Sequence, residues 1–186
     1  HPTRPRRPIA SGALTVPAGA AIGVLTLVGS LVAAYALSAR FGVVATVYAA
    51  LLTAYSVWLK RVVILDVLTV AIGFVLRAVA GAAAIGVEIS GWLVICTILV
   101  ALFLALGKRR HEYLTLHGDA AAHRPILAEY SESFLDQMVA VVTASTVTAY
   151  ALYTMSPVTV GKFHTRWLPL TLPFVLYDVF PYLFLL

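Results

Sequence analysis

Residues 55–82 read YSVWLKRVVILDVLTVAIGFVLRAVAGA, and this stretch holds the pattern that decides the fold. The apolar run that begins at Val62 is long enough for a membrane-spanning helix, which takes about 20 residues. Lys60 and Arg61 come directly before the run, and cations in that position are typical of the cytoplasmic edge of a spanning helix. The stretch therefore predicts a transmembrane helix over 62–87.

The composition of the whole chain supports the same class of protein. Of its 186 residues, 61% are hydrophobic and 11% are charged, and the mean hydropathy is +0.95. Soluble domains are about half apolar and a quarter charged, so a water-soluble core could not bury this much apolar surface. The net charge of +5 comes from short basic clusters between apolar runs, which indicates a membrane protein with no nucleic-acid partner.

Six apolar stretches of spanning length lie along the chain, and the one long polar segment is 108–132. The stretches are 13–37, 43–59, 62–87, 91–107, 133–155 and 167–186. They predict an all-α fold, a polytopic transmembrane helix bundle that forms a single domain over 1–186.

The distribution of positive charge predicts the topology. With six spans, the loops 1–12, 60–61 and 108–132 share one side, and the loops 38–42, 88–90 and 156–166 share the other. The first side carries nine cations, which are Arg4, Arg6, Arg7, Lys60, Arg61, Lys108, Arg109, Arg110 and Arg124. The second side carries three, which are Arg40, Lys162 and Arg166. Because Lys and Arg gather on the cytoplasmic side, the first side is predicted to be cytoplasmic.

Two charges stand inside the third apolar stretch. Asp66 lies near its cytoplasmic start and Arg77 near its middle, where a charge costs about 2.5–3.5 kcal/mol. Eleven residues of helix place both on one face, ~16 Å apart. Such residues face a bundle interior and have a partner or a ligand. Either a structural ion pair or a binding site explains each of them.

Asp66 follows Lys60 and Arg61 by about one helical turn, and this spacing leaves two readings open. The carboxylate could form a salt bridge at the membrane edge, or it could hold Mg²⁺ while the cations hold phosphate. A second mixed-charge group follows the fourth stretch. If that segment is helical, Glu112 lies one turn from both Lys108 and Arg109.

Fewer roles can be assigned around the fifth stretch. Ser133 and Asp136 form an S-x-x-D pattern, which predicts that they cap a helix start. Glu129 and Tyr130 precede that pattern and could line a site.

Three strings resemble the UbiA-type membrane prenyltransferases, in particular their decaprenyl-phosphate phosphoribosyltransferase branch. They are HPTRPRRPIASG at 1–12, the stretch 55–82 quoted above, and LFLALGKRRHEYLTL at 102–116 followed by HRPILAEYS at 123–131. The resemblance runs along nearly the whole chain and implies about six helices of a nine-helix fold. It also implies an active site on the cytoplasmic face of a bacterial inner membrane.

The sequence departs from the family pattern in two places. Where members with aromatic acceptors carry a second Asp-rich motif, this chain has Gly-Lys-Arg-Arg-His-Glu at 107–112, which suits a substrate rich in phosphate. The first Asp-rich motif is expected just before His1. We therefore expect the sequence to be a fragment, truncated at both ends and inactive alone. Asp178 and Pro181 also differ from the pattern of this branch.

The resemblance implies a Mg²⁺-dependent enzyme that joins phosphoribosyl diphosphate to a polyprenyl phosphate in the bilayer, as a step toward lipid-linked arabinose for a cell wall. On this reading, Asp66 and Glu112 are catalytic, either near the metal or at the ribose hydroxyls, and Asp66 is the candidate metal ligand. The expected substrate-binding residues are Arg4, Arg7, Lys60, Arg77, Lys108 and Arg109.

Three other functions remain open from the sequence. An aromatic prenyltransferase of the same superfamily would need the second Asp-rich motif. A transporter or flippase for anionic lipids would also suit a one-sided cationic site, although no paired repeats or broken helices are evident. A structural membrane subunit is the third alternative.

Overall fold

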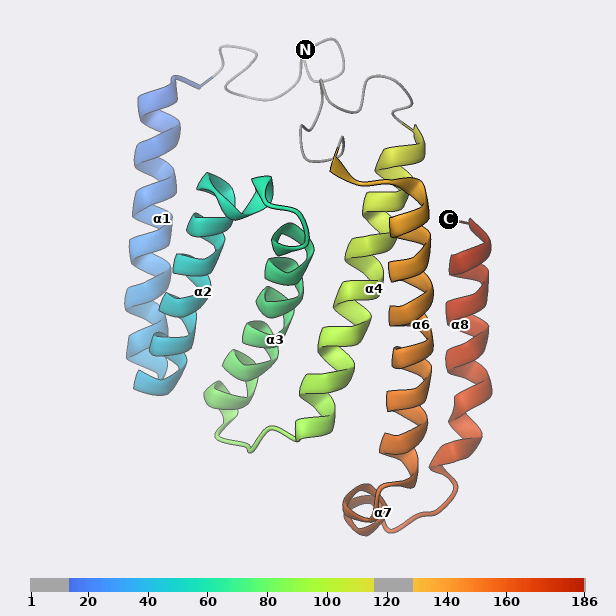
Figure 1. Ribbon diagram of the computed structural model, residues 1–186. Coiled ribbons are helices and arrows are strands. Elements are labelled where there is room, and N and C mark those ends of the chain that lie inside the picture. Colours follow the sequence, from blue (N-terminus) through green and yellow to red (C-terminus); the bar gives the residue numbers. More distant parts are fainter. Residues whose placement is uncertain (1–13, 116–128, 186) are drawn as a thin grey trace.

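The computed structural model describes residues 14–115 and 129–185, which are helical over most of their length (Figure 1). The helices are α1 (Val16–Leu37), α2 (Ala39–Val57), α3 (Leu65–Ile85), α4 (Gly91–Thr115), α6 (Glu132–Met155), α7 (Pro157–Phe163) and α8 (Leu172–Leu185). Two 3₁₀ turns, η1 (Leu59–Arg61) and η3 (Leu168–Thr171), join some of them. The predicted all-α class is confirmed.

Five of these helices, α1 to α4 and α6, are long and apolar enough to cross a membrane. The sixth predicted stretch, 167–186, is occupied by η3 and α8, which continue each other over Leu168–Phe184 but are shorter than the five long helices. This segment meets α7, which lies within the predicted loop 156–166, at an angle of 94°. The bend lies between His164, which has the left-handed conformation at the end of α7, and Pro169, which lacks a backbone N–H and stands in the first turn of η3.

The helices stand in an open row in which each packs mainly against its neighbour in the sequence. The principal contacts join α1 to α2, α2 to α3, α3 to α4, α4 to α6 and α6 to α8. The largest apolar core lies between α3, α4 and α6, and it includes Val67, Phe103 and Leu135. Many large apolar side chains on the outer faces stay exposed, as expected of surfaces that meet lipid or further helices.

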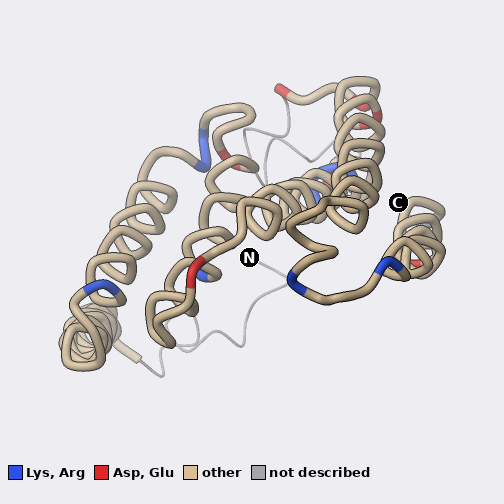
Figure 2. Tube along the Cα trace, turned by 90° about the horizontal axis from the view of Figure 1, so that it is seen from below, with Lys and Arg blue, Asp and Glu red and all other residues tan. Residues whose placement is uncertain are grey.

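Successive helices run in opposite directions, which brings η1, the last turns of α4 and the start of α6 to one end of the row (Figure 1). We call this the basic end. Of the described cations it holds Lys60, Arg61, Lys108, Arg109 and Arg110, while Arg40 at the start of α2 and Lys162 and Arg166 in and after α7 lie at the opposite end (Figure 1). Figure 2 shows the Lys and Arg residues as short separate stretches on a mostly uncharged trace. The alternation of loops that the charges predicted is therefore present in the fold.

The connection between α1 and α2 depends on a close approach at Gly42. Only Ser38 separates the two helices, and Gly42 is buried against the ring of Tyr35. A β-carbon at position 42 would overlap that ring. The Tyr35 hydroxyl also lies 3.2 Å from the hydroxyl of Thr46, so the ring is held from two sides.

We expect Gly42→Ala to lower the free energy of unfolding by about 1–3 kcal/mol, since the added methyl group must displace the Tyr35 ring. The measurement is chemical or thermal unfolding in detergent. The matched control is Gly29→Ala in α1, where a β-carbon meets no atom within 4 Å. Equal effects of the two substitutions would contradict the packing described here.

Candidate active site

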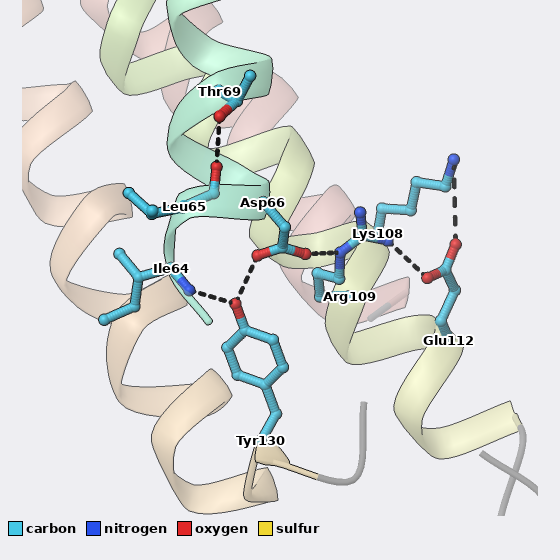
Figure 3. Close-up of polar contacts among 8 residues, drawn as sticks. All are labelled: Ile64, Leu65, Asp66, Thr69, Lys108, Arg109, Glu112 and Tyr130. Carbon is cyan, nitrogen blue, oxygen red and sulfur yellow. Dashed lines mark hydrogen bonds and ion pairs between the residues drawn. The ribbon is translucent and has the colours of Figure 1, made fainter. Parts of the chain in front are cut away.

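A buried ion pair joins α3 to α4 at the basic end. The Nε of Arg109, near the end of α4, lies 2.7 Å from Oδ2 of Asp66 in the first turn of α3 (Figure 3). The side chains are 5% and 0% exposed, so neither charge is solvated by water. Because buried charges are costly unless they are paired and hydrogen-bonded, each of these two residues depends on the other.

Tyr130 completes the hydrogen bonding of Asp66 from a third element. Its hydroxyl donates to Oδ1 of Asp66 at 2.7 Å and accepts from the backbone N–H of Ile64 at 2.9 Å. Tyr130 is itself buried and stands just before α6. Both oxygens of Asp66 therefore have donors, and the network ties the starts of α3 and α6 to the end of α4.

The same network keeps Tyr130 in its neutral form. Burial raises the pKa of the Tyr130 hydroxyl above its ordinary value of 10.0, and the hydrogen bond to Asp66 raises that pKa further. A phenol whose pKa is raised in the folded state stabilises the fold fully below the unfolded pKa. That stability is lost as the pH rises toward the folded pKa. At neutral pH the hydroxyl keeps the proton that it donates to Asp66.

A row of alternating charges leads from this pair to the surface. Arg109 also donates from its Nη1 to Oε2 of Glu112 at 2.6 Å, and Oε1 of Glu112 lies 4.0 Å from Nζ of Lys108. The exposed fractions of the side chains are 0% for Asp66, 5% for Arg109, 26% for Glu112 and 70% for Lys108. The expected helical spacing of residues 108–112 is confirmed, because α4 extends to Thr115.

The sequence matches the model of the UbiA prenyltransferase family over residues 1–186. The chain belongs to the UbiA prenyltransferase family. A match over the full sequence also agrees with the membrane helices and with the resemblance in the three strings.

Curated relatives narrow the comparison within the UbiA family. A decaprenyl-phosphate phosphoribosyltransferase of Corynebacterium glutamicum is 35% identical over 157 residues, which cover 82% of this chain and 47% of that protein. One of Mycolicibacterium smegmatis is 33% identical over 156 residues, covering 84% and 49%. One of Mycobacterium tuberculosis is 29% identical over 153 residues, covering 82% and 51%. The chain spans about half the length of these relatives.

In this UbiA-family chain, four of the expected site residues come together, and they are Asp66, Lys108, Arg109 and Glu112. Lys60 lies in η1 just before α3 and is partly exposed. Arg4 and Arg7 lie outside the described residues. Sequence analysis left Asp66 as either a salt-bridge partner or a Mg²⁺ ligand. In the structure Asp66 forms a salt bridge, and its partner is Arg109 rather than Lys60 or Arg61.

Arg77 lies apart from this group, and its neighbours are aromatic. Its Nε and Nη2 donate to the hydroxyl of Tyr48 in α2 at 2.9 and 2.5 Å. Its guanidinium group also lies 5.3 Å from the centre of the Tyr48 ring and 5.2 Å from that of Phe74. Arg77 is exposed, and within the described residues no ion pair reaches it. These cation–π contacts lower the cost of a charge among apolar helices.

The expectation that Ser133 and Asp136 cap a helix start is wrong. The N-cap of α6 is Ser131, whose hydroxyl accepts from the backbone N–H of Phe134 at 3.2 Å. Asp136 instead accepts from Nε of Arg110 at 2.5 Å and so forms a second link between α4 and α6. The helix begins two residues before the matched pattern, so the carboxylate is turned toward the neighbouring helix.

UbiA prenyltransferases generally use Mg²⁺, a cation that protein carboxylate oxygens bind. Across 14–115 and 129–185, no group of three or more His, Cys, Asp or Glu side chains is placed to hold a metal ion. Asp66 already accepts from Arg109 and Tyr130. These residues by themselves do not fit a Mg²⁺ site.

We expect Asp66→Asn to lower the free energy of unfolding by about 3 kcal/mol, because it leaves the buried charge of Arg109 without its fully buried carboxylate partner. Glu112 still contacts Arg109, so the loss should lie at the low end for a broken buried pair. Unfolding by denaturant in detergent micelles measures it.

The matched control for this substitution is Asp136→Asn. It breaks the Arg110 pair, in which the aspartate side chain is 46% exposed, and pairs of that kind contribute below about 1 kcal/mol. If both variants lose the same stability, the buried pair does not have the structural importance assigned to it.

Proposed function

We propose that the whole protein transfers the 5-phosphoribosyl group from phosphoribosyl diphosphate to a polyprenyl phosphate such as decaprenyl phosphate. The observation that carries the proposal is the row from Asp66 to Lys108, which is held rigidly inside and ends in an exposed cation at the basic end. The three relatives named as decaprenyl-phosphate phosphoribosyltransferases support the same substrates.

The proposed reaction is a substitution at the anomeric carbon of the ribose. An oxygen of the lipid phosphate forms a bond to that carbon, and the bond from the carbon to the diphosphate oxygen breaks. The diphosphate leaves with the electron pair, and the product is polyprenyl-phosphoryl-5-phosphoribose. Nucleophile, donor and leaving group are all anionic, so fixed cations lower the repulsion between them in the transition state.

The geometry supports different roles for the inner and outer members of the row. Lys108 is 70% exposed and suits a contact to phosphate, and Lys60 in η1 is a second candidate for it. Glu112 stands between Arg109 and Lys108, where a carboxylate oxygen could accept from a ribose hydroxyl. Asp66 and Arg109 are bonded to each other, which favours a positioning role over direct contact with substrate or metal.

The proposal includes a requirement for Mg²⁺ by the whole protein. Because the described residues alone do not fit a metal site, we propose that the ligating carboxylates come mainly from other parts of the protein. We also propose that the basic end faces the cytoplasm of a bacterium, where phosphoribosyl diphosphate is made, and that the product serves lipid-linked pentose synthesis. The excess of cations at that end supports this orientation.

The direct test supplies full-length protein in detergent with polyprenyl phosphate, radiolabelled phosphoribosyl diphosphate and Mg²⁺. Label should move into the organic phase, and EDTA should abolish the transfer. Prenylation of 4-hydroxybenzoate from a polyprenyl diphosphate, without phosphoribosyl transfer, would favour the aromatic branch instead. Neither activity in a well-folded sample would favour the lipid-transport alternative.

Lys108→Ala should raise the KM for phosphoribosyl diphosphate about tenfold or more, as expected for the loss of a charge-assisted hydrogen bond to phosphate. The matched control is Lys162→Ala, which removes an exposed cation from α7 at the opposite end of the helices. An unchanged KM in the Lys108 variant, or equal changes in both, would contradict the phosphate contact.

The proposed contact of Arg77 with the lipid phosphate has its own test. Removing that contact with Arg77→Ala should raise the KM for polyprenyl phosphate more than the KM for phosphoribosyl diphosphate. Tyr48→Phe is the comparison, because it removes the hydroxyl that Arg77 contacts but keeps the ring and the cation. Normal kinetics in the Arg77 variant would contradict the contact with the lipid phosphate. The role of Arg77 would then be limited to its contacts with α2.

A further inference from the structure

The junction between η1 and α3 contains a strained turn. Ile64 has φ 69° and ψ −43°, and the N–H of Leu65 donates to the carbonyl of Val63 at 2.8 Å across it. This is a γ-turn of the rare, strained type. A β-branched residue with positive φ is a genuine outlier, and it persists only where the surrounding contacts hold it.

Tyr130 is a contact that holds this turn from outside it. Its hydroxyl accepts from the N–H of Ile64, the strained residue, and donates to Asp66, which lies two residues further on. Tyr130 is 3% exposed, and its ring packs against that of Phe134, 5.9 Å away between centres. The buried hydroxyl oxygen of Tyr130 is therefore hydrogen-bonded both to the backbone of the turn and to the side chain of Asp66 just after it (Figure 3).

The turn also sets the direction of the groups around it. Lys60 and Arg61 precede the turn in η1, and Asp66, which forms the ion pair with Arg109, follows it. If Ile64 relaxed to negative φ, the chain before α3 would leave the helix in a different direction and would carry Lys60 with it. The turn thus fixes where one proposed phosphate contact lies relative to the charged row.

We propose that Tyr130 is a positioning residue for the anionic substrate. It acts by locking the Ile64 turn, and it thereby holds Lys60 at the same end of the helices as the row that ends at Lys108. This inference rests on the proposed function. The hydroxyl is the essential group, because only a group that both donates and accepts makes the two bonds. Tyr130 is buried and does not itself touch the substrate.

The kinetic test compares Tyr130→Phe with wild-type full-length protein in the transfer assay. We expect the KM for phosphoribosyl diphosphate to rise about fivefold or more, the factor that corresponds to one net hydrogen bond, with kcat within about twofold. The control is Tyr150→Phe, which removes the hydroxyl that lies 2.8 Å from Thr171 and should leave the KM unchanged. A purely structural Tyr130 would lower the active fraction and the melting temperature and leave the KM as it is, which would overturn the proposal.

A second variant tests whether the strained turn is the link. Glycine adopts positive φ without strain, so Ile64→Gly allows the turn to form without the lock. Added to Tyr130→Phe, it should bring the raised KM most of the way back to the wild-type value. Ile64 is 46% exposed, so the substitution removes little packing. A double variant whose KM is as high as that of Tyr130→Phe would contradict the link through Ile64.

Hydrogen exchange supplies a readout that does not depend on the activity. In Tyr130→Phe the Ile64 amide loses its acceptor, so peptides containing residues 62–66 should exchange about fivefold faster than in wild type or Tyr150→Phe. Unchanged exchange would overturn the lock even if the transfer activity is present. If exchange at 62–66 is faster in Tyr130→Phe but the wild-type protein has no transferase activity, the hydrogen bond from Ile64 to Tyr130 is supported and the proposed function is rejected.

Discussion

The basic end of this protein depends on one ion pair between two helices. Asp66 and Arg109 lie in surroundings that exclude water, where neither charge would be tolerated alone. Their pairing is stabilised because each has a further partner, Tyr130 for the aspartate and Glu112 for the arginine. The pair also orients what surrounds it. Successive residues of an α-helix point about 100° apart, so turning Arg109 inward turns Lys108 toward the exterior.

This arrangement suits the handling of polyanions at a membrane surface. A cluster of unpaired cations would be held apart by its own repulsion, whereas alternating charges pack closely and still end in an exposed ammonium group. The phosphoribosyl transfer proposed above joins two anionic substrates and would use a site of this kind. Arg77 contacts the hydroxyl and ring of Tyr48 and the ring of Phe74, and among the described Lys and Arg residues it is the one far from either end of the row.

The sequence predicted the fold better than it predicted the site. Apolar run length and the placement of cations gave the five long helices, because both are local properties of the chain. The short helix α7, which lies within the predicted loop 156–166, was not predicted. Asp66 could be found as a charge in an apolar helix, but its partner lies 43 residues away, and the register between α3 and α4 is set by packing. Tyr130 could not be ranked for the same reason.

The most direct test of this account is an experimental structure of the full-length protein with phosphoribosyl diphosphate and Mg²⁺ bound. We predict that Nε of Arg109 and Oδ2 of Asp66 remain within hydrogen-bond distance while phosphate oxygens contact Lys108. A structure in which Asp66 has left Arg109 to coordinate the metal or to contact the diphosphate would contradict it. The ion pair would then exist only without substrate, and Asp66 would act directly on the metal or the substrate instead of positioning other residues.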